Sequence, residues 1–140
     1  MNRLLLCSTL LAILLAPSAQ AADVVVNVLA VRPGGGEVKL LLFDREDGFR
    51  KEDKARQVLR LPAGAGAVTG TFAGLPAGRY AVIAYHDENG DGKLNLRLGM
   101  FPKEGYGLSN NLKPLGPPKF ADAAFDLPDA GLRVDILLDY

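Results

Sequence analysis

The stretch Leu132-Arg133-Val134-Asp135-Ile136-Leu137-Leu138 decides the fold class, because apolar and polar residues alternate along most of it. Successive side chains of a β-strand point to opposite faces of a sheet, so every second residue shares a face. The residues predicted to face inward are Leu132, Val134, Ile136 and Leu138, and those predicted to face outward are Arg133, Asp135 and Asp139. The stretch therefore predicts a strand with one buried face and one solvated face.

A second strand is predicted at Arg79–His86, directly after the tight connection Leu75-Pro76-Ala77-Gly78. Its two faces carry Tyr80, Val82 and Ala84 on one side and Ala81, Ile83 and Tyr85 on the other. A strand that is apolar on both faces is typical of a sheet that is covered on both sides. We therefore expect Arg79–His86 to lie at the centre of its sheet, with Tyr80, Val82, Val134 and Ile136 in the core.

Further strands are predicted wherever the period-two pattern recurs between Gly and Pro turns. These segments are Asp23–Arg32, Glu37–Asp44, Gln57–Leu61, Ala67–Phe72 and Ala123–Leu127. The polar segment Arg45–Ala55 is predicted to hold an irregular crossover or a turn of helix. About seven short strands with turns between them predict an all-β fold: a single antiparallel β-sandwich with Greek-key connections, prealbumin-like or immunoglobulin-like, with one long Gly/Pro-rich loop.

The first residues have the features of a secretory signal peptide. Arg3 provides a positive start, Leu4–Leu15 is an apolar run too short to span a bilayer, and Ala19-Gln20-Ala21 is a small-residue cleavage site. We expect a signal peptide over residues 1–21, cleaved after Ala21, and one domain over residues 22–140. An uncleaved anchor is the alternative. The pattern is typical of bacterial export, which predicts a periplasmic or secreted protein.

The composition limits the partners that the exported chain is expected to have. The only cysteine, Cys7, lies in the predicted signal peptide, so we expect no disulfide in the domain. Lys and Arg number 16 and Asp and Glu number 16, and loss of Arg3 leaves this balance almost neutral. A neutral balance provides no electrostatic case for nucleic acid or an anionic membrane. No second apolar segment could span a bilayer, and an unidentified protein or small molecule of the cell envelope remains the expected partner.

The segment Asp87–Asn95 is rich in acidic and amide side chains. Side-chain oxygens alternate along it, and Gly92 permits a sharp turn. Calcium requires six to eight oxygen ligands, and a curled loop of this pattern could aim its oxygens at one centre. The predicted ligands of a weak Ca²⁺ site are the side chains of Asp87, Asn89, Asp91 and Asn95 and the backbone carbonyl of Lys93.

Two observations speak against a complete EF-hand loop. Leu98 stands where a bidentate Glu is required, so further ligands would have to come from Glu104 or from backbone carbonyls of residues 96–99. Asn-Gly and Asp-Gly are also strong hairpin signals in the absence of any metal. A solvated hairpin is therefore the alternative.

The segment Leu96–Phe120 is predicted to be a long loop, and loops of this length in compact domains are often functional. We expect it to be ordered, because its apolar residues can pack it against the sandwich near the acidic loop. These residues are Met100, Phe101, Tyr106, Leu108, Leu112, Leu115 and Phe120. The candidate ligand-contacting residues are His86, Lys103, Glu104, Tyr106, Ser109 and Asn110. A rigid lid over one end of the sandwich is the alternative interpretation.

No catalytic residue is assigned, although the chain offers His86 and Ser109 as a nominal pair. Ser109 lacks the Gly-x-Ser-x-Gly context of a nucleophile elbow, and His86 and Asp87 are expected to point to opposite faces of their strand. A single histidine without cysteine also disfavours zinc. We expect His86 to hydrogen-bond the acidic loop. The sequence favours a binding or structural module, and the alternative is a periplasmic hydrolase that uses the 96–120 loop.

Several motifs in order resemble a known family. The run Phe72-x-x-Leu75-Pro76-Ala77-Gly78-x-Tyr80 resembles the prealbumin-like sandwich modules, such as the carboxypeptidase regulatory-like domains. Together with His86–Asn95, Pro102–Gly107, Ser109-Asn110 and Gly116–Phe120, the chain resembles the bacterial family DUF2141. The resemblance implies an exported β-sandwich and brings no established activity.

Overall fold

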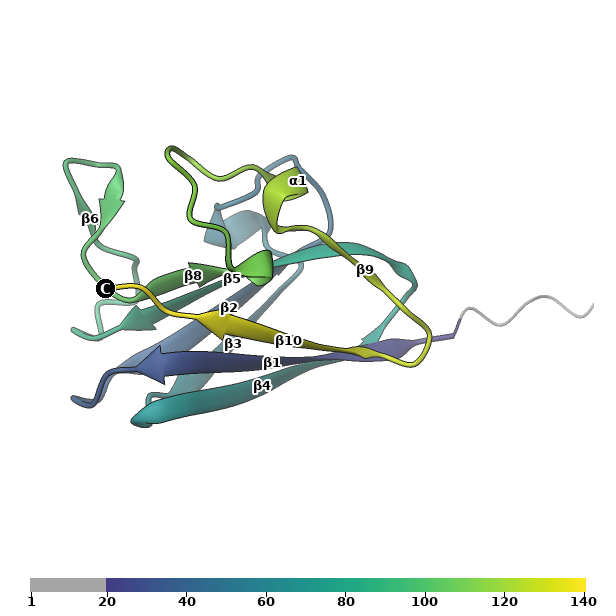
Figure 1. Cartoon of the computed structure of the whole chain (residues 1–140), viewed down its shortest axis with the longest axis horizontal. Helices are drawn as coiled ribbons and strands as arrows, with labels where there is room; N and C mark the ends of the chain where they lie inside the picture. Colours follow the sequence, from purple (N-terminus) through teal and green to yellow (C-terminus); the bar gives the residue numbers. More distant parts are fainter. Residues whose placement is uncertain (1–19) are drawn as a thin grey trace, which may run out of the picture.

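Figure 1 shows the chain as a computed structural model, which describes residues 20–140; most of the predicted signal peptide, residues 1–19, lies outside this range. Two sheets face each other across one core. The three-stranded sheet has the order β10 (Leu132–Leu137), β1 (Ala22–Val31) and β4 (Gly66–Leu75). The larger sheet has the order β3 (Gln57–Pro62), β2 (Glu37–Phe43), β5 (Gly78–Asp87) and β8 (Tyr106–Leu108), with β9 (Phe125–Leu127) paired to the start of β5. The prediction of an all-β fold is therefore confirmed.

The period-two alternation predicts the core correctly. Val24, Val26 and Val28 of β1 are fully buried and belong to the same apolar cluster as Val38, Leu40 and Leu42 of β2. The four residues predicted as core are at most 9% exposed, namely Tyr80, Val82, Val134 and Ile136. The alternating faces of β1, β2, β5 and β10 therefore meet in the space between the two sheets.

The outer face of the larger sheet is also covered, as the two-sided apolar pattern of β5 predicts. A second cluster there contains Leu41 and Phe43 of β2 with Ala81, Ile83 and Tyr85 of β5. The predicted crossover after β2 lies over this face and includes a 3₁₀ turn, Glu52–Lys54; the short helix α1 (Phe120–Ala123) also contributes to it. The ring of Phe49 packs edge-on against those of Phe43 and Phe120, at centroid distances of 5.1 and 5.8 Å.

One strand pair differs from the predicted antiparallel arrangement. β10 runs parallel to β1, with Val26 opposite Val134 and Val28 opposite Ile136. The cause lies in the turn before β10, which is closed by the Gly131 N–H donating to the Pro128 carbonyl at 2.9 Å and carries the chain from β9 to the beginning of β1. Apolar alternation reports which face is buried and contains no information on strand direction, so the smaller sheet is mixed.

The segment 96–120 is only partly the packed loop that we predicted. It contains β8, which joins the larger sheet, and a 3₁₀ turn, Ser109–Asn111. Leu108 is buried, but the hairpin of β6 (Leu96–Arg97) and β7 (Phe101–Pro102) projects away from both sheets (Figure 1). The apolar residues that the prediction placed in contact with the sandwich, and that are instead exposed, are Met100, Phe101, Leu112 and Leu115.

Candidate functional site

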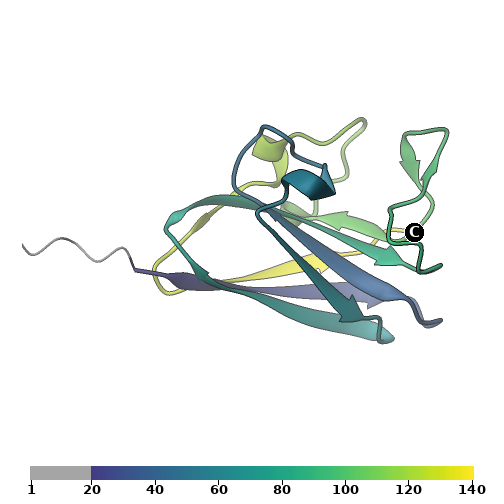
Figure 2. The ribbon, with the colours of Figure 1, turned by 180° about the vertical axis from the view of Figure 1, so that it is seen from behind.

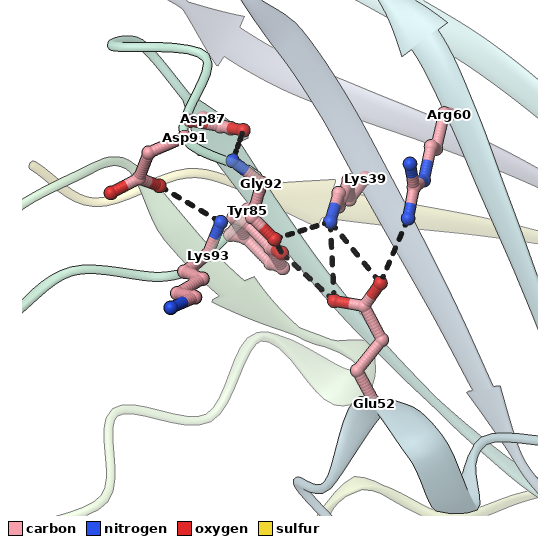
Figure 3. A network of polar contacts seen from close by, with 8 residues as sticks. All are labelled: Lys39, Glu52, Arg60, Tyr85, Asp87, Asp91, Gly92 and Lys93. Carbon is pink, nitrogen blue, oxygen red and sulfur yellow. Dashed lines mark hydrogen bonds and ion pairs between the residues drawn. The ribbon is translucent and has the colours of Figure 1, made fainter.

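The acidic loop begins where β5 ends, and the strand alternation decides how its first side chain is placed. Residues with even numbers on β5 face the core between the sheets, and Tyr85 and Asp87 face the covered outer side. Lys39 of β2 pairs with Tyr85 and therefore shares this face. The outer face of the larger sheet thus brings Lys39, Tyr85 and Asp87 together at the base of the loop (Figure 3).

The loop is curled by side chains that accept backbone hydrogen bonds from residues further along it. Oδ1 of Asn89 accepts from the Asp91 N–H at 3.1 Å, and Oδ1 of Asp91 accepts from the Lys93 N–H at 2.9 Å. Oδ2 of Asp87 accepts from the Gly92 N–H at 2.7 Å, across the loop (Figure 3). Gly92 has φ of 79°, a conformation that glycine adopts without steric cost. These bonds curl the loop, and each occupies one side-chain oxygen of Asp87, Asn89 or Asp91 with a backbone N–H.

The amide side chains of Asn89 and Asn95 complete the cluster. Nδ2 of Asn95 donates to Oδ2 of Asp91 at 2.8 Å, and Nδ2 of Asn89 donates to Oδ1 of Asn95 at 3.0 Å. The hydrogen bond from Asn95 is the largest of the causes that lower the pKa of Asp91, followed by the bond from the Lys93 backbone. The structure therefore brings together the side chains of Asn89, Asp91 and Asn95, as the sequence predicts.

Asp87 differs from the other loop residues because it is buried. It is 1% exposed, and its Oδ1 has no hydrogen-bond partner. Most buried polar atoms in proteins are hydrogen-bonded, and leaving one without a partner is energetically costly. This atom is thus the one buried side-chain nitrogen or oxygen without a partner in the described part of the chain.

Glu104 closes the base of the acidic loop. Its Oε1 accepts from the Glu88 N–H at 3.0 Å and its Oε2 accepts from the Asn95 N–H at 3.1 Å. The side chain is buried, and one carboxylate therefore connects the two ends of the loop. The sequence predicts Glu104 as a neighbour of the loop, and the structure places it there through these backbone contacts.

An ion pair between a buried lysine and a partly exposed glutamate supports the loop from below, and it was not predicted from the sequence. Lys39 is fully buried, and its Nζ donates to the Gly92 carbonyl at 2.6 Å and to Oε1 of Glu52 at 3.1 Å (Figure 3). The Tyr85 hydroxyl donates to Oε2 of Glu52 at 3.1 Å. The signal for this network was available, because Leu41 and Phe43 share the face of Lys39 and predict that this face is covered.

The pKa values of Glu52 and Tyr85 are shifted by burial and by the groups that contact them. Partial burial works to raise the pKa of Glu52, but the hydrogen bond and charge of Lys39, with Tyr85 and Arg60, outweigh it and hold the pKa below its ordinary value. Burial is the main cause that raises the pKa of Tyr85, and the negative charge of Glu52 raises it further. Glu52 is therefore ionised and Tyr85 protonated at neutral pH, as the hydrogen bonds between them require.

His86 does not contact the acidic loop in the way we predicted. Its Nε2 lies 2.7 Å from the Gly35 carbonyl, and its Nδ1 lies 2.9 Å from the Tyr140 hydroxyl. A carbonyl can only accept, so Nε2 carries a proton and donates to Gly35. The residue alternates to the core side of β5, and it therefore joins the β1–β2 turn to the end of the chain.

Ser109 and Asn110 fasten the long segment to its neighbours. The buried Ser109 hydroxyl accepts from the Val82 N–H at 2.9 Å and donates to the Ala123 carbonyl. Nδ2 of Asn110 donates to the Asp122 and Ala124 carbonyls at 3.2 and 3.1 Å. These contacts join the segment to β5 and to the residues around α1.

The remaining candidates are Tyr106 and Lys103. Burial raises the pKa of Tyr106 to about 12, and the backbone of this residue forms a bridge with Asp139. Lys103 is exposed, and its N–H donates to the Asn95 carbonyl at 2.8 Å. Neither residue is brought into contact with the acidic side chains of the loop.

Two hollows on the surface lie elsewhere. One of about 420 Å³ lies where β1 and β10 begin, and one of about 340 Å³ lies between Asn110 and β10. Glu104, Tyr106 and Ser109 line neither of them.

Within residues 20–140 no three His, Cys, Asp or Glu side chains are grouped as metal ligands, so the loop offers two aspartates supplemented by amide and carbonyl oxygens. No helix in the same range is long and apolar enough to cross a membrane.

Comparison with known proteins gives a match at the level of the family. Neither the curated proteins nor the solved structures contain a match to the chain. A family model matches residues 26–135, a range that runs from β1 to β10 and contains the acidic loop, its supporting ion pair and the projecting hairpin. The description of that family is "Uncharacterized protein conserved in bacteria (DUF2141)", and this chain belongs to it.

Proposed function

We propose that this protein is an exported β-module that binds one Ca²⁺ ion in the loop Asp87–Asn95. Its two sheets are proposed to form a single prealbumin-like sandwich, which the shared core between them supports. Export to the periplasm or beyond is supported by the signal-like residues 1–21. The ion would make the loop rigid at one end of the sandwich, as is appropriate for a binding or structural module.

The observation that carries the proposal is the environment of Asp87. Its Oδ2 is held by the Gly92 N–H within the loop, and its buried Oδ1 has no donor. A buried carboxylate oxygen without a donor is an unfilled acceptor, and a cation bound in the loop would fill it. A hydrogen-bonded hairpin uses only Oδ2 of Asp87, which accepts from the Gly92 N–H, whereas a metal loop requires an oxygen ligand at its first position.

The donor set favours calcium over other metals. Asp87, Asn89 and Asp91 are proposed as side-chain ligands, with the Lys93 carbonyl and Asn95 adding further oxygens. Oxygen ligands of mixed kind in a flexible loop suit Ca²⁺, whereas zinc prefers nitrogen and sulfur and Mg²⁺ demands a more regular octahedron. Two carboxylates are few for a tight site, so we expect a Kd on the order of 10⁻⁴–10⁻³ M.

The hydrogen bonds of Asn89 support a position for the proposed ion. Nδ2 of Asn89 points at Oδ1 of Asn95 and, at 3.4 Å, at Oδ2 of Asp91. This amide group thus supplies positive hydrogen atoms to the oxygens that the ion would coordinate. Calcium would replace that donor, and a turn of the Asn89 amide would present its oxygen to the ion in exchange for the bond that this oxygen accepts from the Asp91 N–H.

The test compares calcium binding by the wild type with that of Asp87→Asn and Glu88→Gln. Glu88→Gln is the matched control, because it removes one negative charge from the same loop at an exposed position outside the proposed ligand set. We expect calorimetry to give heat of calcium binding for the wild type and Glu88→Gln. Asp87→Asn should lose at least tenfold in affinity.

Thermal melting provides the second measurement. A ligand that binds only the native state stabilises it by about 2.7 kcal/mol at a hundredfold excess over Kd. Calcium at about 10 mM is about ten- to a hundredfold above the expected Kd, so it should stabilise the wild type by about 1.4–2.7 kcal/mol and raise its melting temperature by about 5–10 °C, and magnesium should have less effect. Equal melting with calcium and with EDTA, together with no heat of binding, would show that the loop is a polar hairpin.

A further inference from the structure

The hairpin that follows the acidic loop exposes large apolar side chains at its tip. Leu98 is 82% exposed, Met100 66% and Phe101 58%. The hairpin projects from the body of the molecule in both views, and its apolar residues therefore have no part in the core (Figures 1 and 2). An exposed group of this kind marks an interaction site or an aggregation liability.

The backbone at the tip of the hairpin favours an interaction site over an aggregation liability. Leu98 and Gly99 have φ of 54° and 70°, and the turn is closed by the Met100 N–H donating to the Arg97 carbonyl at 3.2 Å. Such a turn favours Asn-Gly, because a bulky residue at positive φ is strained. Leu98 has neither a suitable conformation nor a packing contact to offset the strain. A residue whose type does not suit its backbone conformation, and which gains no packing contact in return, is expected at a functional site.

A second projection lies on the same side of the molecule. Residues 112–119 form a loop that rises from the body on the side of the β6–β7 hairpin (Figures 1 and 2). Leu115 in this loop is fully exposed, and Leu112 is 44% exposed. The apolar groups are thus carried on two separate projections rather than on one flat patch.

The segment that carries these projections is predominantly basic, although the whole chain is neutral and the adjoining loop contributes the exposed acids Glu88 and Asp91. Residues 93–119 contain five basic side chains and one acidic one. The basic residues are Lys93, Arg97, Lys103, Lys113 and Lys119, and all are exposed. The acidic one, Glu104, is buried with both oxygens occupied by backbone N–H groups. Lys113 has an exposed ion-pair partner, Asp139, at 3.0 Å.

We propose that the β6–β7 hairpin and the 112–119 loop dock the protein on the surface of an anionic phospholipid membrane. Leu98, Met100 and Phe101 would enter the boundary between head groups and acyl chains. The basic residues behind them would lie at the level of the lipid phosphates, where each Lys or Arg attracts anionic lipid.

A lipid surface fits these features better than a protein partner does. Protein interfaces centre on a packed apolar patch, with charged residues depleted from its core. Here narrow apolar tips are surrounded by lysine and arginine, which can extend their charged ends to phosphates while their stems remain in apolar surroundings. The neutral net charge of the whole chain does not reveal this basic segment, because all acidic residues except Glu104 lie outside residues 93–119.

The docking proposal goes beyond the calcium site and does not require it. The two are adjacent, because Asn95 ends the acidic loop and its N–H is held by Glu104, while Leu96 begins the hairpin. A bound ion would therefore place further positive charge beside the same membrane. Measurements with EDTA and with calcium separate the two proposals.

The experiment uses protein recovered after export from a bacterium that expresses the full chain, with its N-terminus determined by mass spectrometry. Sedimentation is measured with vesicles of phosphatidylcholine alone and with vesicles containing a quarter of phosphatidylglycerol, in EDTA and in calcium. We expect the wild type to bind the anionic vesicles and to be released by salt. Neutral vesicles should bind at least tenfold less protein, and Arg97→Glu/Lys103→Glu should abolish the difference.

Leu98→Asn tests the apolar tip without endangering the fold, because Asn suits positive φ. Its matched control is Leu137→Asn, at a leucine that is 52% exposed on β10. We expect Leu98→Asn to lower the partition coefficient about tenfold, as the loss of a buried leucine predicts. Leu137→Asn should bind as the wild type does.

The possible outcomes separate the two proposals clearly. Vesicle binding in EDTA by a protein that shows no heat with calcium supports docking and rejects the calcium site. Binding in EDTA by a protein that does give heat with calcium supports both, whereas binding that requires calcium contradicts docking by the hairpin and the 112–119 loop alone. Docking is overturned if anionic vesicles leave the wild type in solution in both buffers, if Leu98→Asn binds undiminished, or if the hairpin captures a protein while ignoring lipid.

Discussion

Nζ of Lys39 lies 2.6 Å from the carbonyl oxygen of Gly92, so a buried charge on β2 holds the turn of a loop that begins 48 residues later at Asp87. The same ammonium group is paired with Glu52 in the crossover that covers the sheet. A buried charge is tolerated only when it is paired and hydrogen-bonded. The fold of the acidic loop therefore depends on three segments that the ion pair holds together.

The two members of this pair should differ in their effect on stability. Glu52→Ala would leave the ammonium of Lys39 buried without a counter-charge, which typically costs about 3–5 kcal/mol. Lys39→Met should cost less, because the Glu52 side chain is 36% exposed and keeps Tyr85 and Arg60 as partners. Urea unfolding of both variants measures the difference.

Arg60→Ala is the control for this comparison. Arg60 contacts the same carboxylate at 3.3 Å but is 59% exposed. Exposed ion pairs contribute about 0–1 kcal/mol, so this variant should unfold close to the wild type. If Lys39→Met destabilised the protein more than Glu52→Ala, the desolvation of Lys39 would not be the dominant effect.

The ion pair also predicts a pH dependence at the acidic end of the scale. The pKa of Glu52 is lower in the folded protein than the ordinary value of about 4.3. The unfolded state therefore binds the proton more readily, and the stabilisation is present above that pH and lost as pH falls through the folded pKa. The stability difference between wild type and Glu52→Gln should be constant above about pH 5.5 and shrink below about pH 4. A difference that grew on acidification would contradict this sign.

The strand faces were predictable from sequence, whereas strand direction and long-range polar contacts were not. Val134 and Ile136 are buried as their alternation predicts, because burial of a strand face is a local property of the pattern. The parallel pairing of β10 with β1 depends on where the chain crosses between sheets, which alternation does not encode. The contact of Lys39 with Glu52 was missed because Glu52 lies 13 residues away in an irregular crossover, and the pattern of one strand does not locate such a partner.

The candidate site was predictable to the extent that its residues are close in sequence. The contacts among Asn89, Asp91 and Asn95 follow from the spacing of oxygens in one loop. The partners of His86 do not, because Gly35 and Tyr140 are each more than fifty residues away. The exposure of Met100 and Phe101 was missed for another reason. Apolar residues in a loop were assumed to pack inward, and no local pattern distinguishes packing from projection.

The strain at the hairpin tip gives a prediction for the isolated protein. Leu98→Asn should make the turn more stable by about 1 kcal/mol, because Asn tolerates positive φ and Leu does not. The hairpin is remote from the core, so hydrogen exchange of the Met100 amide is the suitable measurement, and its protection should increase about fivefold. Protection that decreased would show that the leucine makes a stabilising contact within the chain.

Gly107 of β8 lies where the larger sheet closely approaches β10 of the smaller sheet, at the end that carries the acidic loop. A Cβ on Gly107 would lie 2.7 Å from the Leu137 carbonyl oxygen, and this backbone atom cannot move without disturbing β10. Overpacking of this kind costs about 1–3 kcal/mol, so Gly107→Ala should lower the midpoint of urea unfolding. Gly64→Ala is the control, because its Cβ would meet nothing within 4 Å and its φ is not positive. That substitution should be neutral or stabilise by a few tenths of a kcal/mol, since it reduces the freedom of the unfolded chain. If Gly107→Ala unfolded like Gly64→Ala, β8 and β10 would be free to separate, and the Tyr106–Asp139 bridge would not join the sheets at this end.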